Sequence, residues 1–146
     1  MSPILLNVPG IPRPQPRPRF VRGRVVSTAD ANAKRWISQV EAAARRAAGD
    51  RGKATGPLSV LIDFTFPTKV ASRHGQPHTS RPDADNLAKL VLDCVMRAGL
   101  IGDDAAVSCV VARKTWGKAS HAGASIVVGP DRRVVLPPDP ERPDWV

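Results

Sequence analysis

The sequence predicts a mixed α/β fold in which a small mixed β-sheet is flanked by two main helices. Two long stretches repeat their apolar residues with the period of an α-helix, and several shorter stretches rich in Val, Ile and Leu have the pattern of strands. The 146 residues are 42% hydrophobic but only 4% aromatic, so a single core built mostly from Val, Leu, Ile and Ala is expected.

The N-terminal region combines short strands with a proline-rich segment. Residues 4–8 are expected as a first strand, and the alternating prolines and basic residues that follow predict an extended, exposed stretch. Residues 20–26 are expected as a second strand that carries Arg22 and Arg24 on one face.

The first helix is predicted within residues 28–50, which are rich in alanine. Ser27 and Thr28 are candidate N-cap residues, and Gly49 is suited to end the helix. Five residues at helical spacing are expected to face the core: Trp36, Ile37, Val40, Ala44 and Ala47.

The clearest strand pattern lies in residues 57–67, where apolar side chains occupy every second position. The residues expected to face the core are Leu58, Val60, Ile62 and Phe64. Residues 68–81 contain glycine and proline and are expected to form a loop.

The second helix follows that loop and is the best defined element. Asp83 or Asp85 can cap its start, and Gly99 can end it. Its apolar stripe consists of Leu87, Leu90, Val91, Cys94, Val95 and Ala98. Residues 105–115 and 124–128 are expected as the remaining strands.

The chain is expected to form one domain over residues 1–129, with a proline-rich, charged tail at 130–146 that packs weakly. No apolar run approaches the length that a bilayer requires, and the N-terminus does not resemble a secretion signal. Cys94 and Cys109 lie in apolar segments and are expected as reduced, buried thiols. These features indicate a cytoplasmic protein without a membrane partner.

The charge of the chain, +9, is concentrated at one end. Residues 1–53 carry eleven Lys and Arg against three Asp and Glu, whereas residues 54–146 carry eleven against ten. A basic region of this kind favours a polyanionic partner such as nucleic acid. The candidate phosphate contacts are Arg13, Arg17, Arg19, Arg22 and Arg24.

A group of carboxylates stands out on this basic chain. Asp83 and Asp85 are two residues apart where the second helix begins, and Asp103 and Asp104 follow that helix. If the chain returns after the helix, three of these carboxylates converge. Hard oxygen ligands at that density suit Mg²⁺ or Mn²⁺. A divalent cation between carboxylate and phosphate oxygens is the arrangement of a metal-dependent nuclease.

Several residues near the carboxylates have two readings. Lys89 lies one turn after Asp85, where it can contact a scissile phosphate or simply form an ion pair. Asn86 can fix a carboxylate or cap the helix, and Asp93 is expected in a supporting position or in solvent. His78, the histidine nearest the carboxylates, is expected on the surface.

The segment RPDADNLAKLVLDCVMRAGLIGDDAAV resembles the signature of RusA-type Holliday junction resolvases, a family common in phages and prophages. Its parts occur in the family's order: D-x-D-N-L-x-K, an apolar helix, a glycine turn and an Asp-Asp pair. Weaker similarity extends over about residues 4–128, and the tail is not part of it.

The resemblance implies a homodimeric, Mg²⁺-dependent endonuclease that cuts four-way DNA junctions, in which Mn²⁺ is expected to substitute. It implies that Asp83, Asp85 and Asp104 bind the metal and that Lys89 is catalytic. Asp103 is a weaker candidate beside Asp104. Lys114 matches a basic position of the family and is expected to contact DNA.

Two other functions remain open from the residues. The chain can be a non-catalytic nucleic-acid-binding protein whose carboxylates only cap a helix. It can also be a nuclease of broader specificity that acts on flaps or replication forks. Comparison of cleavage across junction, fork and linear duplex separates these readings.

Overall fold

The computed structural model describes residues 1–26 and 30–132. The helices and strands, in chain order, are β1 (Ile4–Pro9), β2 (Arg19–Val21), β3 (Arg24–Val26), α1 (Ala31–Ala48), β4 (Leu58–Pro67), α2 (Ala84–Arg97), β5 (Val107–Gly117) and β6 (Gly123–Pro130). Short 3₁₀ turns occupy Ala71–Arg73, Asp104–Ala106 and Ala119–His121.

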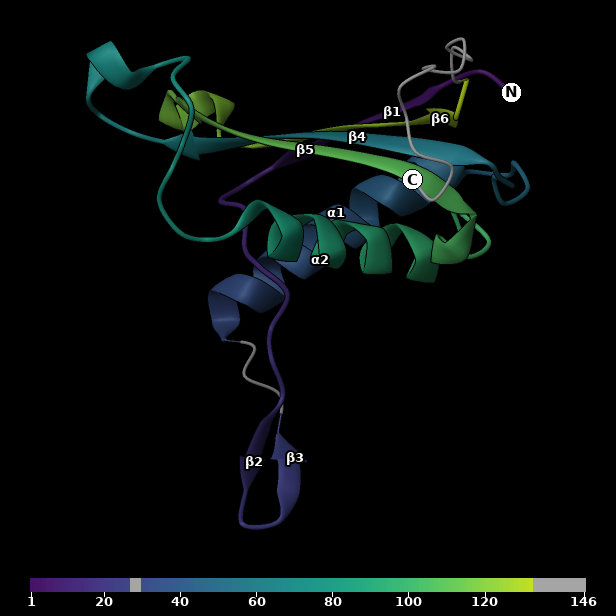
Figure 1. Cartoon of the computed structure of the whole chain (residues 1–146), viewed down its shortest axis with the longest axis horizontal. Coiled ribbons are helices and arrows are strands. Elements are labelled where there is room, and N and C mark those ends of the chain that lie inside the picture. Colours follow the sequence, from purple (N-terminus) through teal and green to yellow (C-terminus); the bar gives the residue numbers. More distant parts are fainter. Residues whose placement is uncertain (27–29, 133–146) are drawn as a thin grey trace, which may run out of the picture.

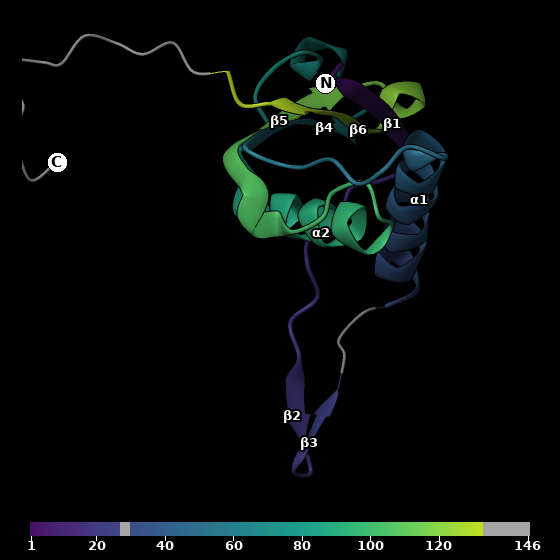
Figure 2. The same cartoon turned by 90° about the vertical axis from the view of Figure 1, so that its right-hand side faces the viewer.

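Four strands form one mixed sheet in the order β1-β6-β4-β5. β4 and β5 run parallel, whereas β6 is antiparallel to both β1 and β4. Both helices cover the same face of this sheet, as Figures 1 and 2 show. The mixed sheet with two main helices confirms the predicted fold class. Two neighbouring parallel strands need a long crossover connection. α2, which follows β4 and precedes β5 in the sequence, forms this crossover and runs back along the sheet.

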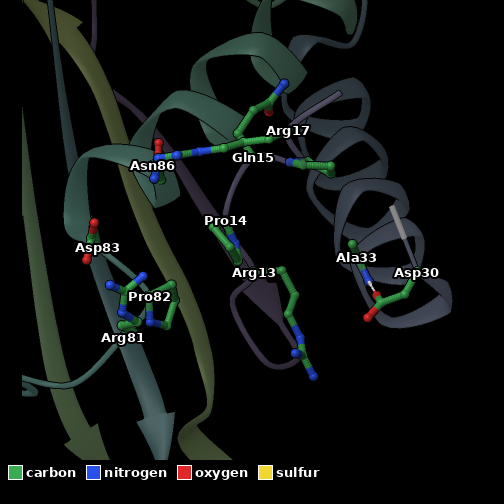
Figure 3. A pocket seen from close by; sticks show the side chains of 11 residues that line it. Arg13, Pro14, Gln15, Arg17, Asp30, Ala33, Arg81, Pro82, Asp83 and Asn86 are labelled. Atoms are coloured by element: carbon green, nitrogen blue, oxygen red, sulfur yellow. Dashed lines mark hydrogen bonds between the residues drawn. The ribbon is translucent and has the colours of Figure 1, made fainter. Parts of the chain in front are cut away.

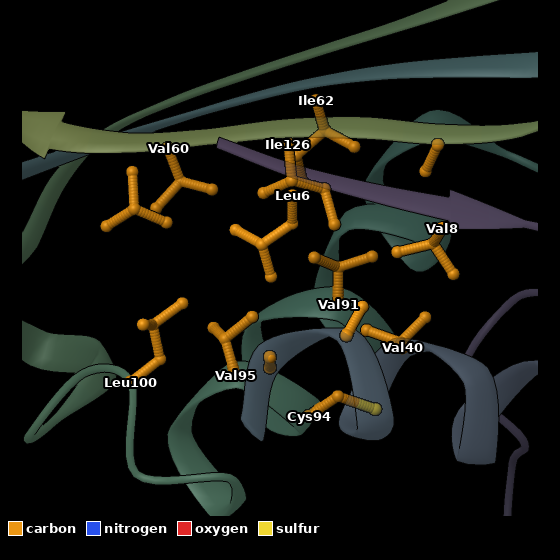
Figure 4. Close-up of a cluster of buried hydrophobic side chains, with 14 of the residues drawn as sticks. Leu6, Val8, Val40, Val60, Ile62, Val91, Cys94, Val95, Leu100 and Ile126 are labelled. Atoms are coloured by element: carbon orange, nitrogen blue, oxygen red, sulfur yellow. The ribbon is translucent and has the colours of Figure 1, made fainter. Parts of the chain in front are cut away.

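The core lies between the sheet and the two helices (Figure 4). Alternate residues of β4 point into it, and the four predicted inward residues are all buried: Leu58, Val60, Ile62 and Phe64. Most of the core is aliphatic, as the low aromatic content predicts. The predicted stripe of α2 is also buried, except that Ala98 is only partly covered.

α1 begins at Asp30, whose carboxylate accepts a hydrogen bond from the Ala33 N–H at 2.8 Å. This is ordinary N-capping, and it comes after the two predicted caps, Ser27 and Thr28, which lie outside the described residues. The helix ends at Gly49 as predicted, with a φ of 48° that glycine adopts readily.

The prediction of a single strand over residues 20–26 is wrong. The chain turns at Arg22 and Gly23, whose φ angles are 50° and 76°, and β2 and β3 form an antiparallel hairpin. Two successive residues with positive φ are what a tight two-residue hairpin turn requires. All six strand residues are exposed, and the hairpin extends away from the sheet and helices (Figures 1 and 2).

The C-terminal half follows the predicted order with small shifts. β5 begins at Val107 because a 3₁₀ turn occupies Asp104–Ala106. β6 extends to Pro130, and residues 133–146 of the predicted tail lie outside the described part of the chain. Both cysteines are free thiols. Cys94 is buried as expected, and burial raises its pKa to about 11, whereas Cys109 is only partly buried. No helix within residues 1–26 and 30–132 has the length and apolar character needed to cross a bilayer.

Candidate active site

The start of α2 carries two carboxylates, Asp83 and Asp85. Asp83 is the N-cap residue by backbone position, but its side chain makes no capping hydrogen bond. Asp85 lies in the first turn, where one carboxylate oxygen accepts from the Asn86 N–H at 2.9 Å. Both side chains are exposed. A purely structural role as helix caps therefore does not account for Asp83.

Lys89 lies one helical turn beyond Asp85 and is also exposed. Among the described residues, no ion pair joins it to Asp85 or Asp93, so the simple charge ladder is not formed. The ammonium group is thus available one helical turn beyond Asp85. A cation in this position can contact a phosphate that the carboxylates alone would repel.

Asp103 and Asp104 lie where the chain turns from α2 into β5. Asp103 accepts a hydrogen bond from the Ala105 N–H at 3.0 Å. This bond, and then a hydrogen bond from the Asp104 carboxyl, hold the pKa of Asp103 below its ordinary value. Asp104 begins the 3₁₀ turn and is exposed.

The two acidic groups do not meet within one chain. α2 has 14 residues, so its ends are about 21 Å apart at 1.5 Å per residue. Asp83 precedes its first residue, whereas Asp104 follows its last after a short turn. No group of three potential metal ligands is assembled within the part of the chain that the structure describes. The convergence of three carboxylates in one protomer is therefore not observed.

Lys114 supports the segment that carries Asp83. Its ammonium group donates to the carbonyl oxygens of Ser80 and Pro82 at 2.7 and 2.8 Å. Pro82 directly precedes Asp83, so Lys114 ties the entry of α2 to strand β5. A contact of Lys114 with DNA stays a prediction, but its observed bonds are to the protein backbone.

His78 is buried, which corrects the expectation of a surface histidine. Its ring lies between Phe66 and Trp116, with ring centroids 4.3 and 4.1 Å away. Its backbone N–H also donates to the Lys114 carbonyl at 3.0 Å. Removal from water, and next the charge of Lys114, hold the pKa of His78 below its ordinary value of 6.5. A lone histidine in a polar loop gave no signal of this aromatic stack.

Acidification is expected to destabilise the fold through His78. Between its lowered native pKa and 6.5, the unfolded chain binds a proton that the native chain does not. The free energy of unfolding should therefore be highest above pH 6.5, fall as the pH drops through this window, and level off below the native pKa. Urea unfolding across pH 4.5–8 measures this effect. A His78→Gln variant should lose this component, and an unchanged pH profile would show that His78 does not cause it.

A pocket of about 520 Å³ lies beside Asp83 (Figure 3). The proline-rich arm forms one wall, and the starts of α1 and α2 form the others. The arm is attached to α2, since the Gln15 N–H donates to the Asn86 carbonyl at 3.2 Å. Three arginines line the pocket against two aspartates: Arg13, Arg17, Arg81, Asp30 and Asp83.

The predicted basic residues fall into two groups. Arg13 and Arg17 line the pocket, whereas Arg19, Arg22 and Arg24 lie on the hairpin. Sequence reasoning did not include Arg81, although its position two residues before Asp83 was a usable signal. Nothing in the sequence indicated that Asp30 would approach the same pocket.

Comparison with known proteins adds one finding to this geometry. Residues 9–128 match a protein-family model described as Endodeoxyribonuclease RusA. A search of curated proteins found no match. The matched segment includes the arm, both helices, β4, β5, most of β6 and all of the acidic residues discussed above, but only the last residue of β1. Since it covers most of the 146 residues, the chain belongs to the RusA endodeoxyribonuclease family.

Proposed function

We propose that this chain is a Mg²⁺-dependent, structure-selective endodeoxyribonuclease that resolves Holliday junctions by paired hydrolysis of phosphodiester bonds. The observation that carries the proposal is the start of α2. There Asp83, Asp85 and, one helical turn further, Lys89 are all exposed, within the segment matched to the family. The reaction would take place on DNA, in the cytoplasm of a bacterial or phage-infected cell.

The residues at this end of α2 fit a hard divalent cation. Mg²⁺ is commonly bound by one or two carboxylates, together with phosphate oxygens and water, and Asp83 and Asp85 supply such a pair. When bound, the ion would activate water and neutralise charge on the phosphate. Asp104 is the proposed third carboxylate. Mn²⁺, which accepts the same oxygen ligands, is expected to replace Mg²⁺.

The remaining side chains have roles that follow from their positions. Lys89 can donate hydrogen bonds to a phosphate oxygen and stabilise negative charge that develops there. The N-terminal end of the α2 dipole also favours an anion at this place. Asn86 and Asp103 are proposed to orient the carboxylates, and Asp93, which is partly buried, to support the helix beneath them.

A homodimer is proposed because one chain separates the carboxylates that the reaction needs together. A two-fold axis that runs α2 antiparallel to the partner's α2 brings the start of one helix to the end of the other. Each site would then contain Asp83 and Asp85 from one protomer and Asp104 of the partner subunit. Two equivalent sites also match the two like-oriented strands that a resolvase must cut.

Cleavage of a labelled four-way junction by the purified protein tests the proposal. Paired nicks on the junction are expected with Mg²⁺ and Mn²⁺, none are expected in EDTA, and a linear duplex of matched sequence should stay intact. Tight junction binding without cleavage in any divalent ion would instead support a non-catalytic DNA-binding protein. Equal cleavage of flaps, forks and junctions would support the broader nuclease.

The hairpin arginines are expected to contribute phosphate contacts. The double variant Arg22→Gln, Arg24→Gln should weaken junction binding and reduce the slope of log Kd against log salt, by about 0.9 for each duplex phosphate contact that is lost. Titrations between 50 and 200 mM NaCl measure this slope. The double variant Arg46→Gln, Arg51→Gln removes the same charge from the other end of α1 and should change the slope less. A wild-type slope in the Arg22→Gln, Arg24→Gln protein would show that the hairpin arginines do not touch DNA.

A further inference from the structure

We infer that the pocket beside Asp83 holds a single nucleotide that has left the base stack at the branch point of the DNA. This inference rests on the proposed function and concerns how a branch is distinguished from a duplex. It assigns a ligand to the space between the arm, α1 and α2. The ligand is recognised through both its phosphate and its base.

The pocket has the size and shape for such a ligand. Its volume of about 520 Å³ lies within the range of pockets that enclose small molecules. In Figure 3, Arg13 and Pro14 of the arm lie between the Arg81–Asp83 segment and the start of α1. The pocket is thus an open concavity lined by the arm, α1 and the start of α2. The convex surface of an intact duplex cannot enter a concave space of this kind, whereas an extruded nucleotide can.

The residues that line the pocket include both cationic and apolar groups, which suit the phosphate and the base of a nucleotide. Arg13, Arg17 and Arg81 provide guanidinium groups that suit phosphate oxygens. Pro14 and Pro16 of the arm and Ala33 of α1 provide apolar surface, on which a base can lie flat. The Asn86 side chain, which also lines the pocket, has the donors and acceptors to read a base edge.

Position then links the pocket to cleavage. Asp83 belongs both to the pocket wall and to the proposed metal ligands. A nucleotide in the pocket would therefore place its neighbouring phosphate next to the reacting groups. Unstacking costs a few kcal/mol within a duplex and least where bases are already unpaired. The continuous base stack of a duplex is interrupted at a branch point, so extrusion should cost less there and the pocket would favour cleavage there.

Fluorescence of 2-aminopurine tests this inference without any cleavage. The base is placed in turn at each position around the branch point, and protein is added in EDTA. A several-fold rise over the free junction is expected at one position. Ala33→Leu, which fills the pocket without changing charge, should abolish the rise and lower kcat/KM for the junction at least tenfold. Its affinity for linear duplex should remain unchanged.

Ala31→Leu is the control for a larger side chain on the same helical turn, because Ala31, unlike the buried Ala33, is exposed and does not line the pocket. It should behave as the wild type. No rise at any position with bound wild-type protein would overturn the inference, and this measurement does not depend on the folding of a variant. A rise that persists in a folded Ala33→Leu protein would overturn it as well.

The outcomes also separate this inference from the proposed function. Metal-dependent junction cleavage without a fluorescence change would overturn nucleotide binding in the pocket and still support the proposed nuclease activity. If the protein cleaves no DNA but shows a fluorescence rise that Ala33→Leu abolishes, nucleotide binding in the pocket would be supported and the proposed nuclease activity overturned.

Discussion

Asp83→Asn and Asp104→Asn proteins are each expected to be inactive on a four-way junction, whereas a mixture of the two should nick it on one strand. Loss of either carboxylate removes a proposed metal ligand, so activity should fall by more than the roughly 10–100-fold that outer-shell changes cost. In the mixed dimer, one site contains both substitutions and the other contains neither. The restored protein should therefore make single nicks without resolving the junction.

The experiment needs purified mixed dimers and a matched control dimer. Differently tagged variants are co-expressed, the mixed dimer is purified through both tags, and its products are separated on denaturing and native gels. A dimer of Asp83→Asn with Asp85→Asn is the control, because both substitutions affect the same end of α2 and no intact site is formed. Equal inactivity of the two mixed dimers would show that Asp104 does not complete the partner's site.

Lys114→Met is expected to lower kcat by about 10–100-fold, the effect that removal of a supporting group near a metal site usually has. The Kd for junction DNA should stay within about twofold. The reason is geometric: the ammonium group holds the carbonyls of Ser80 and Pro82, and the next residue is Asp83. Release of this segment would let the Asp83 carboxylate move, and the observed bonds of the ammonium group are to the protein backbone.

Single-turnover cleavage and binding in EDTA separate the two quantities. Lys118→Met is a suitable control, since Lys118 is exposed, lies four residues further along the chain and carries the same charge. If Lys114→Met instead weakens binding and leaves kcat unchanged, the lysine contacts DNA, as the family resemblance implies. That result would remove its positioning role.

The parts of the fold that the sequence predicts well are those whose burial is set by a local period. The alternation in β4 and the stripe of α2 each determine one buried face, and the structure confirms both. The hairpin was missed because Arg22 and Gly23 interrupt a short run of β-formers, and a single glycine is a weak signal at that length. Turn chemistry, and not hydrophobic pattern, determines that element.

The site could be predicted only in part, for a related reason. The motif identifies Asp83, Asp85 and Lys89, which lie within two turns of one another, so local geometry suffices. The position of Asp104 depends on where β5 begins, and the parallel pairing of β5 with β4 leaves it at the far end of α2. The pocket joins three segments that are distant in sequence. No local sequence pattern predicts that these three segments lie side by side.

The length of α2 also has a consequence for the substrate. In the proposed dimer, each site would join the start of one α2 to the end of the other, so the two sites would lie about one helix length apart, or about 21 Å. The length of α2 would thus set the distance between the two cleavage sites, whatever the DNA sequence. Both strands of like polarity would be cut only in a junction that can place one of them in each site at the same time. A junction held in another geometry would be bound without being resolved.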